Sequence, residues 1–195
     1  MERVSDKQKI LIVDDSEMNR SILADMLGDE YEILEAENGS EGVAMLQTRG
    51  SEISLVLLDI VMPGLDGFGV LNMMNKNGWI EDIPVIMISA ESGSSHVERA
   101  FDLGVTDFIS RPFDALIVHR RVVNTILLYA KQKKLVSLVA EQIYEKVWNE
   151  QADYAVENTV MVHIRHIREK VEIDSKRPRY VKVVWGIGYK MEKYS

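Results

Sequence analysis

The first 130 residues alternate short apolar runs with stretches of helical periodicity, and this alternation limits the chain to few folds. The apolar runs are typical of strands, and the first of them is continuous and rich in β-branched residues, as expected for a strand that is buried on both faces. They lie at 9–14, 31–36, 54–59, 84–89 and 107–110. Helical patterns follow them at about 16–28, 40–47, 67–75, 95–103 and from 114 onward. We therefore predict an α/β domain with a five-stranded, doubly wound parallel sheet that has helices on both faces.

From residue 114 to about 149 the chain contains neither glycine nor proline, and apolar residues recur at intervals of three and four. This pattern predicts a long last helix that extends beyond a small sheet, so that its far half needs another partner. A coiled-coil dimer is one solution, and two helices with a bend near 131–134 are another. Beyond it, a helix over about 158–172 and a hairpin within 179–191 complete a small helix–helix–hairpin unit.

Charge is unevenly distributed along the chain. Residues 1–130 contain 10 Lys/Arg and 22 Asp/Glu, whereas residues 131–195 contain 13 Lys/Arg and 9 Asp/Glu. The net charge of −8 is therefore the sum of an acidic first part and a basic second part, which indicates two modules with different partners. We place a first domain at 1–130, a helical linker running into the effector at 131–150, and a second domain at 151–195.

Cysteine is absent from the sequence, which excludes a disulfide framework and thiolate metal sites and fits a reducing compartment. The start of the sequence lacks the apolar core of a signal peptide. Its longest apolar runs are far shorter than the ~20 residues that a membrane span requires. We expect a soluble, cytoplasmic protein that does not associate with membranes.

Acidic residues gather where the predicted strands end. Asp14 ends the first apolar run and Asp15 comes directly after it, and Asp59 ends the third. Such residues meet at one edge of a parallel sheet, where three carboxylates need a cation to offset their repulsion. Mg²⁺ prefers oxygen ligands, and one carboxylate can act as a nucleophile toward phosphorus. Ser89, which ends the fourth run, and Arg111, which follows the fifth, are placed to receive phosphoryl oxygens.

These positions, together with the sequence DIVMPGLDG at 59–67, resemble the CheY-like, flavodoxin-like receiver domain of two-component response regulators. The resemblance covers residues 7–130 and implies that Asp59 accepts a phosphoryl group in a phosphorelay. It implies that Asp14, Asp15, Asp59 and the backbone carbonyl of Val61 bind Mg²⁺. It also implies a sensor histidine kinase as the phosphodonor.

The same resemblance implies a switch. The hydroxyl of Ser89 moves toward the phosphoryl group, the ring of Phe108 follows, and the face of the fourth helix, fifth strand and fifth helix is reshaped. The family has lysine where this chain has Arg111, followed by a cis bond to the next proline. Because arginine is bulkier and forked, this departure bears on the rate and the occurrence of phosphorylation.

The basic tail carries a second pattern. Four apolar residues at 160, 164, 167 and 171 share one face of a predicted helix, and basic side chains are free to face outward. With the sequences VMVHIRHIR at 160–168 and GIGY at 186–189, residues 141–193 resemble the winged-helix effector domain of OmpR/PhoB-type regulators. The resemblance implies DNA contacts from Thr159, Arg165, His166, Arg168, Arg179 and Lys182. His166 stands where that family usually has arginine.

Members of that family carry a small antiparallel sheet and a first helix ahead of the segment that 141–148 resembles, and this chain lacks both. Residues 128–139 are more similar to the helical linkers of receivers with other output domains, which suggests a natural or constructed fusion. We predict a partial winged helix that borrows apolar cover from the long helix or from a second chain. A homodimer would supply this apolar cover, and domain exchange between protomers is one form that it can take.

We therefore expect a response regulator, not an enzyme, that is phosphorylated on Asp59 and regulates transcription through duplex DNA. An alternative is a phosphorylation-sensing dimerisation or interaction module whose shortened tail does not bind DNA. A third hypothesis is a phosphate-independent dimer in which Arg111 mimics or blocks the phosphorylated state. A metal-dependent hydrolase is the most distant alternative.

Overall fold

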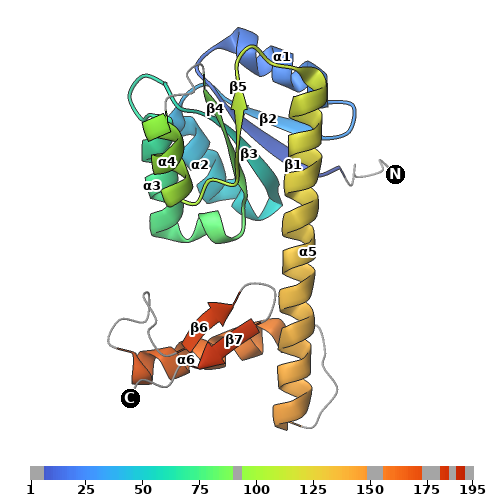
Figure 1. Ribbon diagram of the computed structural model, residues 1–195, viewed down its shortest axis with the longest axis vertical. Coiled ribbons are helices and arrows are strands. Elements are labelled where there is room, and N and C mark those ends of the chain that lie inside the picture. Colours follow the sequence, from blue (N-terminus) through green and yellow to red (C-terminus); the bar gives the residue numbers. More distant parts are fainter. Residues whose placement is uncertain (1–6, 90–93, 149–155, 173–180, 185–187, 192–195) are drawn as a thin grey trace. The chain divides into compact units, whose positions relative to one another are not determined.

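The computed structural model describes residues 7–89, 94–148, 156–172, 181–184 and 188–191 (Figure 1). The chain divides into two compact units, Met1–Leu127 and Leu128–Ser195, and each is described by itself.

The first unit is built on a five-stranded parallel sheet, as the alternating sequence pattern predicted. Its strands are β1 (Lys9–Val13), β2 (Glu32–Ala36), β3 (Ile53–Asp59), β4 (Val85–Ser89) and β5 (Asp107–Ser110). They are ordered β2-β1-β3-β4-β5, and every neighbouring pair is parallel. The winding reverses between β1 and β3, so the carboxyl ends of these two strands flank the place where such sheets bind ligands.

Helices cover both faces of this sheet (Figure 1). They are α1 (Glu17–Leu27), α2 (Gly39–Arg49), α3 (Gly67–Asn77), α4 (Ser94–Asp102) and α5 (Ala115–Trp148), with short 3₁₀ turns η1 (Gly50–Glu52) and η2 (Trp79–Glu81). Successive side chains of a strand point to opposite faces. Leu11 and Val13 of β1 therefore pack with α2 and α3, whereas Ile10 and Ile12 pack with α1 and α5.

Polar side chains start four of these helices by accepting a backbone N–H of the first turn, which has no partner within the helix. The capping residues are Ser16 for α1, Asn38 for α2, Asp66 for α3 and Asp114 for α5. The hydroxyl of Ser16 accepts from the N–H of Asn19 at 3.4 Å. These caps fix where each loop after a strand becomes a helix.

The long helix predicted from residue 114 is a single element. α5 runs from Ala115 to Trp148, and residues 131–134 lie within it. The structure therefore does not divide this segment into two helices near 131–134, and the coiled-coil dimer stays a prediction.

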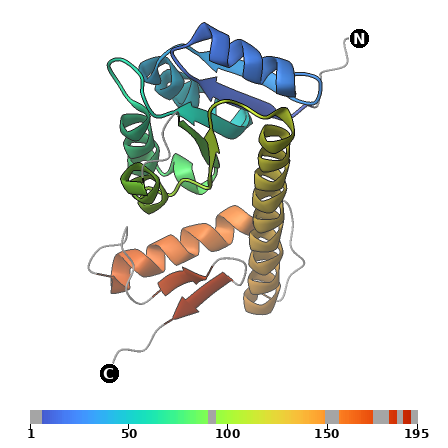
Figure 2. The same ribbon diagram turned by 45° about the horizontal axis from the view of Figure 1, so that its top comes forward.

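The second unit contains the last part of α5, α6 (Val156–Val171), and a hairpin of β6 (Val181–Val184) and β7 (Gly188–Met191) (Figure 2). The hairpin strands are antiparallel, with Val181 opposite Met191. Ala140 and Tyr144 of α5 form a small hydrophobic cluster with Val160 and Ile164 of α6. Within the described residues, no helix is both long enough and apolar enough to cross a membrane.

Candidate functional site

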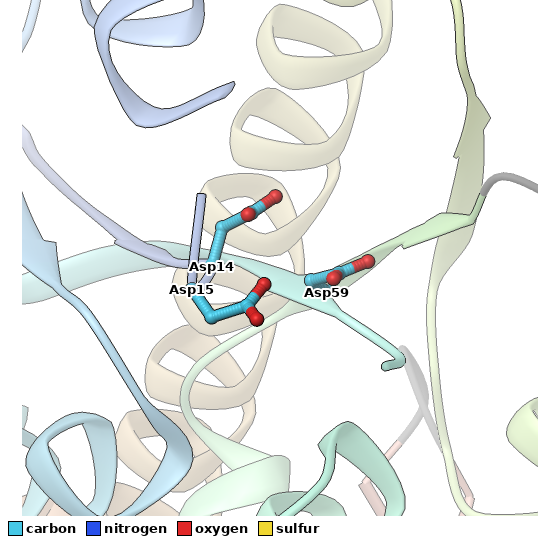
Figure 3. Close-up of side chains that lie close together, drawn as sticks. All are labelled: Asp14, Asp15 and Asp59. Atoms are coloured by element: carbon cyan, nitrogen blue, oxygen red, sulfur yellow. The ribbon is translucent and has the colours of Figure 1, made fainter. Parts of the chain in front are cut away.

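Three carboxylates meet at the carboxyl ends of β1 and β3 (Figure 3). Asp14 and Asp15 follow β1 and Asp59 ends β3, and one oxygen of each lies within 4.8 Å of the others. Asp14 and Asp59 are 0% and 1% exposed, whereas Asp15 is exposed. This arrangement fits a hard divalent cation, because it offers clustered oxygen ligands and leaves one side open to water.

Hydrogen bonds fix the orientation of Asp14. Its Oδ1 accepts from the backbone N–H of Ser16 at 2.8 Å, and both of its oxygens accept from Asn19 Nδ2, at 3.1 and 3.0 Å. Arg20 donates to the backbone carbonyl of Asp14 at 2.9 Å. The first turn of α1 thus holds this carboxylate in place while its charge remains close to Asp59.

The environment of Asp59 raises its pKa from 3.8 to about 6. Desolvation by burial is the largest cause, followed by the repulsive charge of Asp14. The positive charge of Arg111 and the backbone N–H of Ile60 act in the opposite direction. A carboxylate held under such repulsion gains from a cation, and pKa shifts of this kind concentrate at functional sites.

Arg111 supplies the positive charge of the site. Its Nη2 donates to Oδ1 of Asp59 at 2.7 Å, and its Nη1 lies 4.0 Å from Oδ2 of Asp14. Its backbone N–H donates to the carbonyl of Ser89 at 3.0 Å, which ties the loop after β5 to the end of β4. The bond between Arg111 and Pro112 is cis, as the family resemblance implied.

The remaining predicted residues lie on the strands and loops around this cluster. Ser89, the last residue of β4, is 8% exposed, and Phe108 of β5 is partly buried, its ring centroid 5.8 Å from that of Phe101. Val61 lies two residues after β3, with its side chain exposed. The structure therefore brings Asp14, Asp15, Asp59 and Arg111 together.

Close backbone packing holds the end of β3 in position. Gly67, the first residue of α3, approaches β3 so closely that a Cβ atom there would lie 2.3 Å from the carbonyl oxygen of Asp59. Its N–H donates to the carbonyl of Ile60 at 3.0 Å. A side chain at this position would displace the strand end that carries Asp59.

The predicted DNA-contacting residues divide into three groups. Arg165 and His166 lie on α6 with exposed side chains, and Arg165 forms an ion pair with Glu169 at 3.2 Å. Thr159 and Lys182 lie in α6 and β6, but their side chains are outside the described part of the structure, as is all of Arg179. The third group is Arg168 alone.

Arg168 turns toward the hairpin. Its Nε donates to the carbonyl of Val181 at 3.0 Å, and Glu172 accepts from the N–H of Val181 at 2.7 Å. The two side chains, four residues apart, hold both polar backbone groups of a buried residue of β6. They attach the hairpin to the end of α6.

Sequence reasoning missed Asn19 and Glu172, which support the two candidate sites. The signal for Asn19 was its place in the first turn after the Ser16 cap, where a side chain can reach back to the strand end. Glu172 gave no such signal, because no sequence periodicity relates it to Val181, nine residues further along the chain.

Comparison with known families bears on both units. The family model of the response regulator receiver domain matches residues 10–123, more than half of the chain. The chain belongs to the response regulator receiver family. A second family model, the C-terminal domain of transcriptional regulatory proteins, matches residues 125–191. This response regulator therefore has a receiver domain and a transcriptional regulatory C-terminal domain.

The chain aligns with known relatives over nearly their whole length. The chain is 29% identical over 233 aligned positions to the uncharacterized transcriptional regulatory protein YcbL of Bacillus subtilis (strain 168), covering 95% of this chain and 100% of the relative. It is 28% identical to the DNA-binding dual master transcriptional regulator RpaA of Synechocystis sp., covering 94% of this chain and 95% of the relative. Since 233 positions exceed the 195 residues here, YcbL has residues without a counterpart in this response regulator.

Solved structures support the fold of the receiver. The chemotaxis protein CheY4 of Vibrio cholerae matches with a TM-score of 0.57 at 23% identity, covering 61% of this chain and 98% of that chain. NtrX of Brucella abortus matches with a TM-score of 0.62 at 24% identity, covering 83% of this chain and 34% of that chain. Both likenesses concern the fold alone.

Proposed function

We propose that Asp59 is the phospho-acceptor and that a sensor histidine kinase is the donor. A carboxylate oxygen of Asp59 attacks the phosphorus of the kinase phosphohistidine, and the P–N bond breaks as the O–P bond forms. The imidazole leaves with the electron pair, and Asp59 becomes an acyl phosphate. The observation that carries this assignment is the buried Asp59 carboxylate, paired with Arg111 at 2.7 Å beside two further carboxylates.

The acidic cluster fits Mg²⁺ as the cofactor. Asp14, Asp15, Asp59 and the backbone carbonyl of Val61 would hold it, and Asn19 and Ser16 keep Asp14 oriented. When bound, Mg²⁺ supplies positive charge that offsets the repulsion among the carboxylates and the charge of the transferred group.

After transfer, the residues around Asp59 bind the phosphoryl group. Arg111 keeps a guanidinium within reach of the phosphoryl oxygens, where its planar fork binds two of them. The Ser89 hydroxyl donates to a third oxygen, and Phe108 of the neighbouring strand follows it inward. The phosphorylated state thus differs from the unphosphorylated one at β4 and β5, and the chain acts as a switch and not as an enzyme for a separate substrate.

Labelling with acetyl phosphate tests the acceptor. The full chain with Mg²⁺ should take up one phosphoryl group, seen as a mass increase. Asp59→Asn should abolish it, because an amide is not a nucleophile for this step. Asp25→Asn, at an exposed position of α1, is the matched control and should label like the wild type. Equal labelling of Asp59→Asn would refute the assignment.

We infer that the output is transcriptional regulation through duplex DNA, with residues 1–130 as receiver, 131–150 as linker and 151–195 as effector. The exposed Arg165 and His166 of α6 support this, since basic side chains on one helix suit phosphate and base contacts in the major groove. We further propose a homodimer that acts in the cytoplasm, where kinase and DNA are both accessible. An interaction module with a tail that does not bind DNA is the alternative.

Binding to a mixed-sequence 30-base-pair duplex separates these two functions. The DNA hypothesis predicts an affinity that falls steeply between low and high salt, because each neutralised phosphate releases counterions. The interaction module predicts no binding at low salt by a chain whose circular dichroism shows a folded tail.

A further inference from the structure

The last part of α5 is apolar on two roughly opposite sides. On one side Ala140, 3% exposed, contacts the cluster that it forms with Tyr144 and with Val160 and Ile164 of α6. The other side carries leucines that belong to none of the hydrophobic clusters of the described residues. A helix that is apolar on opposite sides is normally buried on both.

These leucines form a stripe, which we define as Leu128, Leu135 and Leu138. Their exposed fractions are 50%, 44% and 44%. At 3.6 residues per turn, Leu138 lies about 160° around the helix from Ala140 and about 60° from Leu135. The spacings of seven and three residues are those of a short coiled-coil seam, in which the partner is another helix.

The charges along the stripe indicate which helix covers it. Along residues 128–145, which include the stripe, Lys131 and Lys134 lie in the first half, and Glu141 and Glu145 lie in the second half. Lys131, Lys134 and Glu145 are exposed, and Glu141 is half-buried. Two such segments side by side in the same direction bring like charges together, whereas opposite directions bring the basic half of each onto the acidic half of the other.

We propose that residues 128–145 of α5 pair antiparallel with the same segment of a second copy of this chain. The pairing covers the leucine stripe of both copies, places Leu138 near the two-fold axis, and sets Lys131 and Lys134 of one copy against the acidic half of the other. It rests on the proposed homodimer and assigns its interface. It does not depend on phosphorylation of Asp59.

The sequence contains no cysteine, so a single introduced thiol can form a disulfide only with the same thiol in a second chain. The direction of pairing can therefore be measured directly. Under mild oxidation of the full chain, Leu138→Cys should give a covalent dimer, because this position meets itself across the axis. Leu128→Cys should crosslink no more than Ser51→Cys, an exposed residue of η1 that reports random collision. Crosslinking of Leu128→Cys at the level of Leu138→Cys would show parallel pairing and overturn the proposal, as would a Leu138→Cys chain that does not crosslink above the Ser51→Cys level.

Charge reversal gives an independent readout by analytical ultracentrifugation. Lys131→Glu and Glu145→Lys should each weaken the dimer about threefold to tenfold, and the double variant should return to within about threefold of the wild type. Parallel pairing predicts no effect of either single reversal, because like charges would face each other before and after. Either that result or a monomeric wild-type chain would overturn the proposed interface. Neither would bear on Asp59 as the phospho-acceptor, which the acetyl phosphate labelling tests independently.

Discussion

The Nη2 atom of Arg111 lies 2.7 Å from Oδ1 of Asp59, within a site that contains two further carboxylates. The guanidinium is partly buried, and its Nε has no hydrogen-bond partner among the described residues. The guanidinium therefore holds a permanent positive charge beside the proposed nucleophile. Its Nε is a donor that can still accept a hydrogen-bonding partner. The effect of this ion pair can be measured with substitutions at Arg111 and at Asp59.

Arg111→Gln should raise the pKa of Asp59 above its present value of about 6, because Arg111 is the charge that lowers it. Arg111→Lys, which keeps the charge, is the matched control and should stay near the wild type. Both values can be followed by carbon NMR of the aspartate carboxyl groups in metal-free buffer. An unchanged midpoint in Arg111→Gln would show that this ion pair does not control the charge of Asp59.

Asp59→Asn should stabilise the metal-free protein at neutral and alkaline pH. The folded pKa of Asp59 is raised from 3.8 to about 6, so folding favours the protonated form, and ionisation above pH 6 costs stability. The gain should reach up to about 3 kcal/mol at pH 8 and fall away as the pH drops from 6 to 4, where Asp59 becomes neutral in both states. Urea unfolding at several pH values measures it. A gain that is constant with pH would contradict this origin.

Gly67→Ala should destabilise the receiver by on the order of 1–3 kcal/mol, because its Cβ would lie 2.3 Å from the backbone oxygen of Asp59. The closest contact is backbone, so the strand end must move. Gly50→Ala is the control: its Cβ would meet only Ile83, at 3.6 Å, in a right-handed helical backbone. That variant should be neutral or more stable by about 0.4–1 kcal/mol. Equal stabilities of the two variants would rule out the close approach.

Arg168→Ala and Arg165→Ala should weaken duplex DNA binding in different ways. Arg165 is exposed, and its ion pair with Glu169 can be exchanged for a phosphate, so its loss should reduce the salt slope of log K by about 0.9. Arg168 holds the hairpin through Val181, so its loss should lower the thermal stability of the tail and leave that slope unchanged. A reduced slope for Arg168→Ala would instead make it a phosphate contact.

Much of the fold followed from local pattern, and much of the site from topology. Apolar runs predicted every strand of the receiver to within about two residues, and the central strands most directly, because a strand buried on both faces leaves little freedom in composition. Asp14 and Asp59 were predicted to meet because parallel strands end at one edge. The inward turn of Arg168 could not be predicted, because it depends on side-chain reach across elements and not on periodicity.

The two edge strands of the receiver carry charge. In β2, Glu32 forms an ion pair with Lys9 at 3.6 Å, and Glu35 forms one with Arg20 at 3.1 Å. The other edge strand, β5, is only four residues long, and its Asp107 is paired with Arg121. Short or charged edges resist the addition of a further strand. The open rows of backbone N–H and C=O groups are therefore poor templates for aggregation. At high protein concentration, we therefore expect the receiver sheets of separate copies not to join edge to edge.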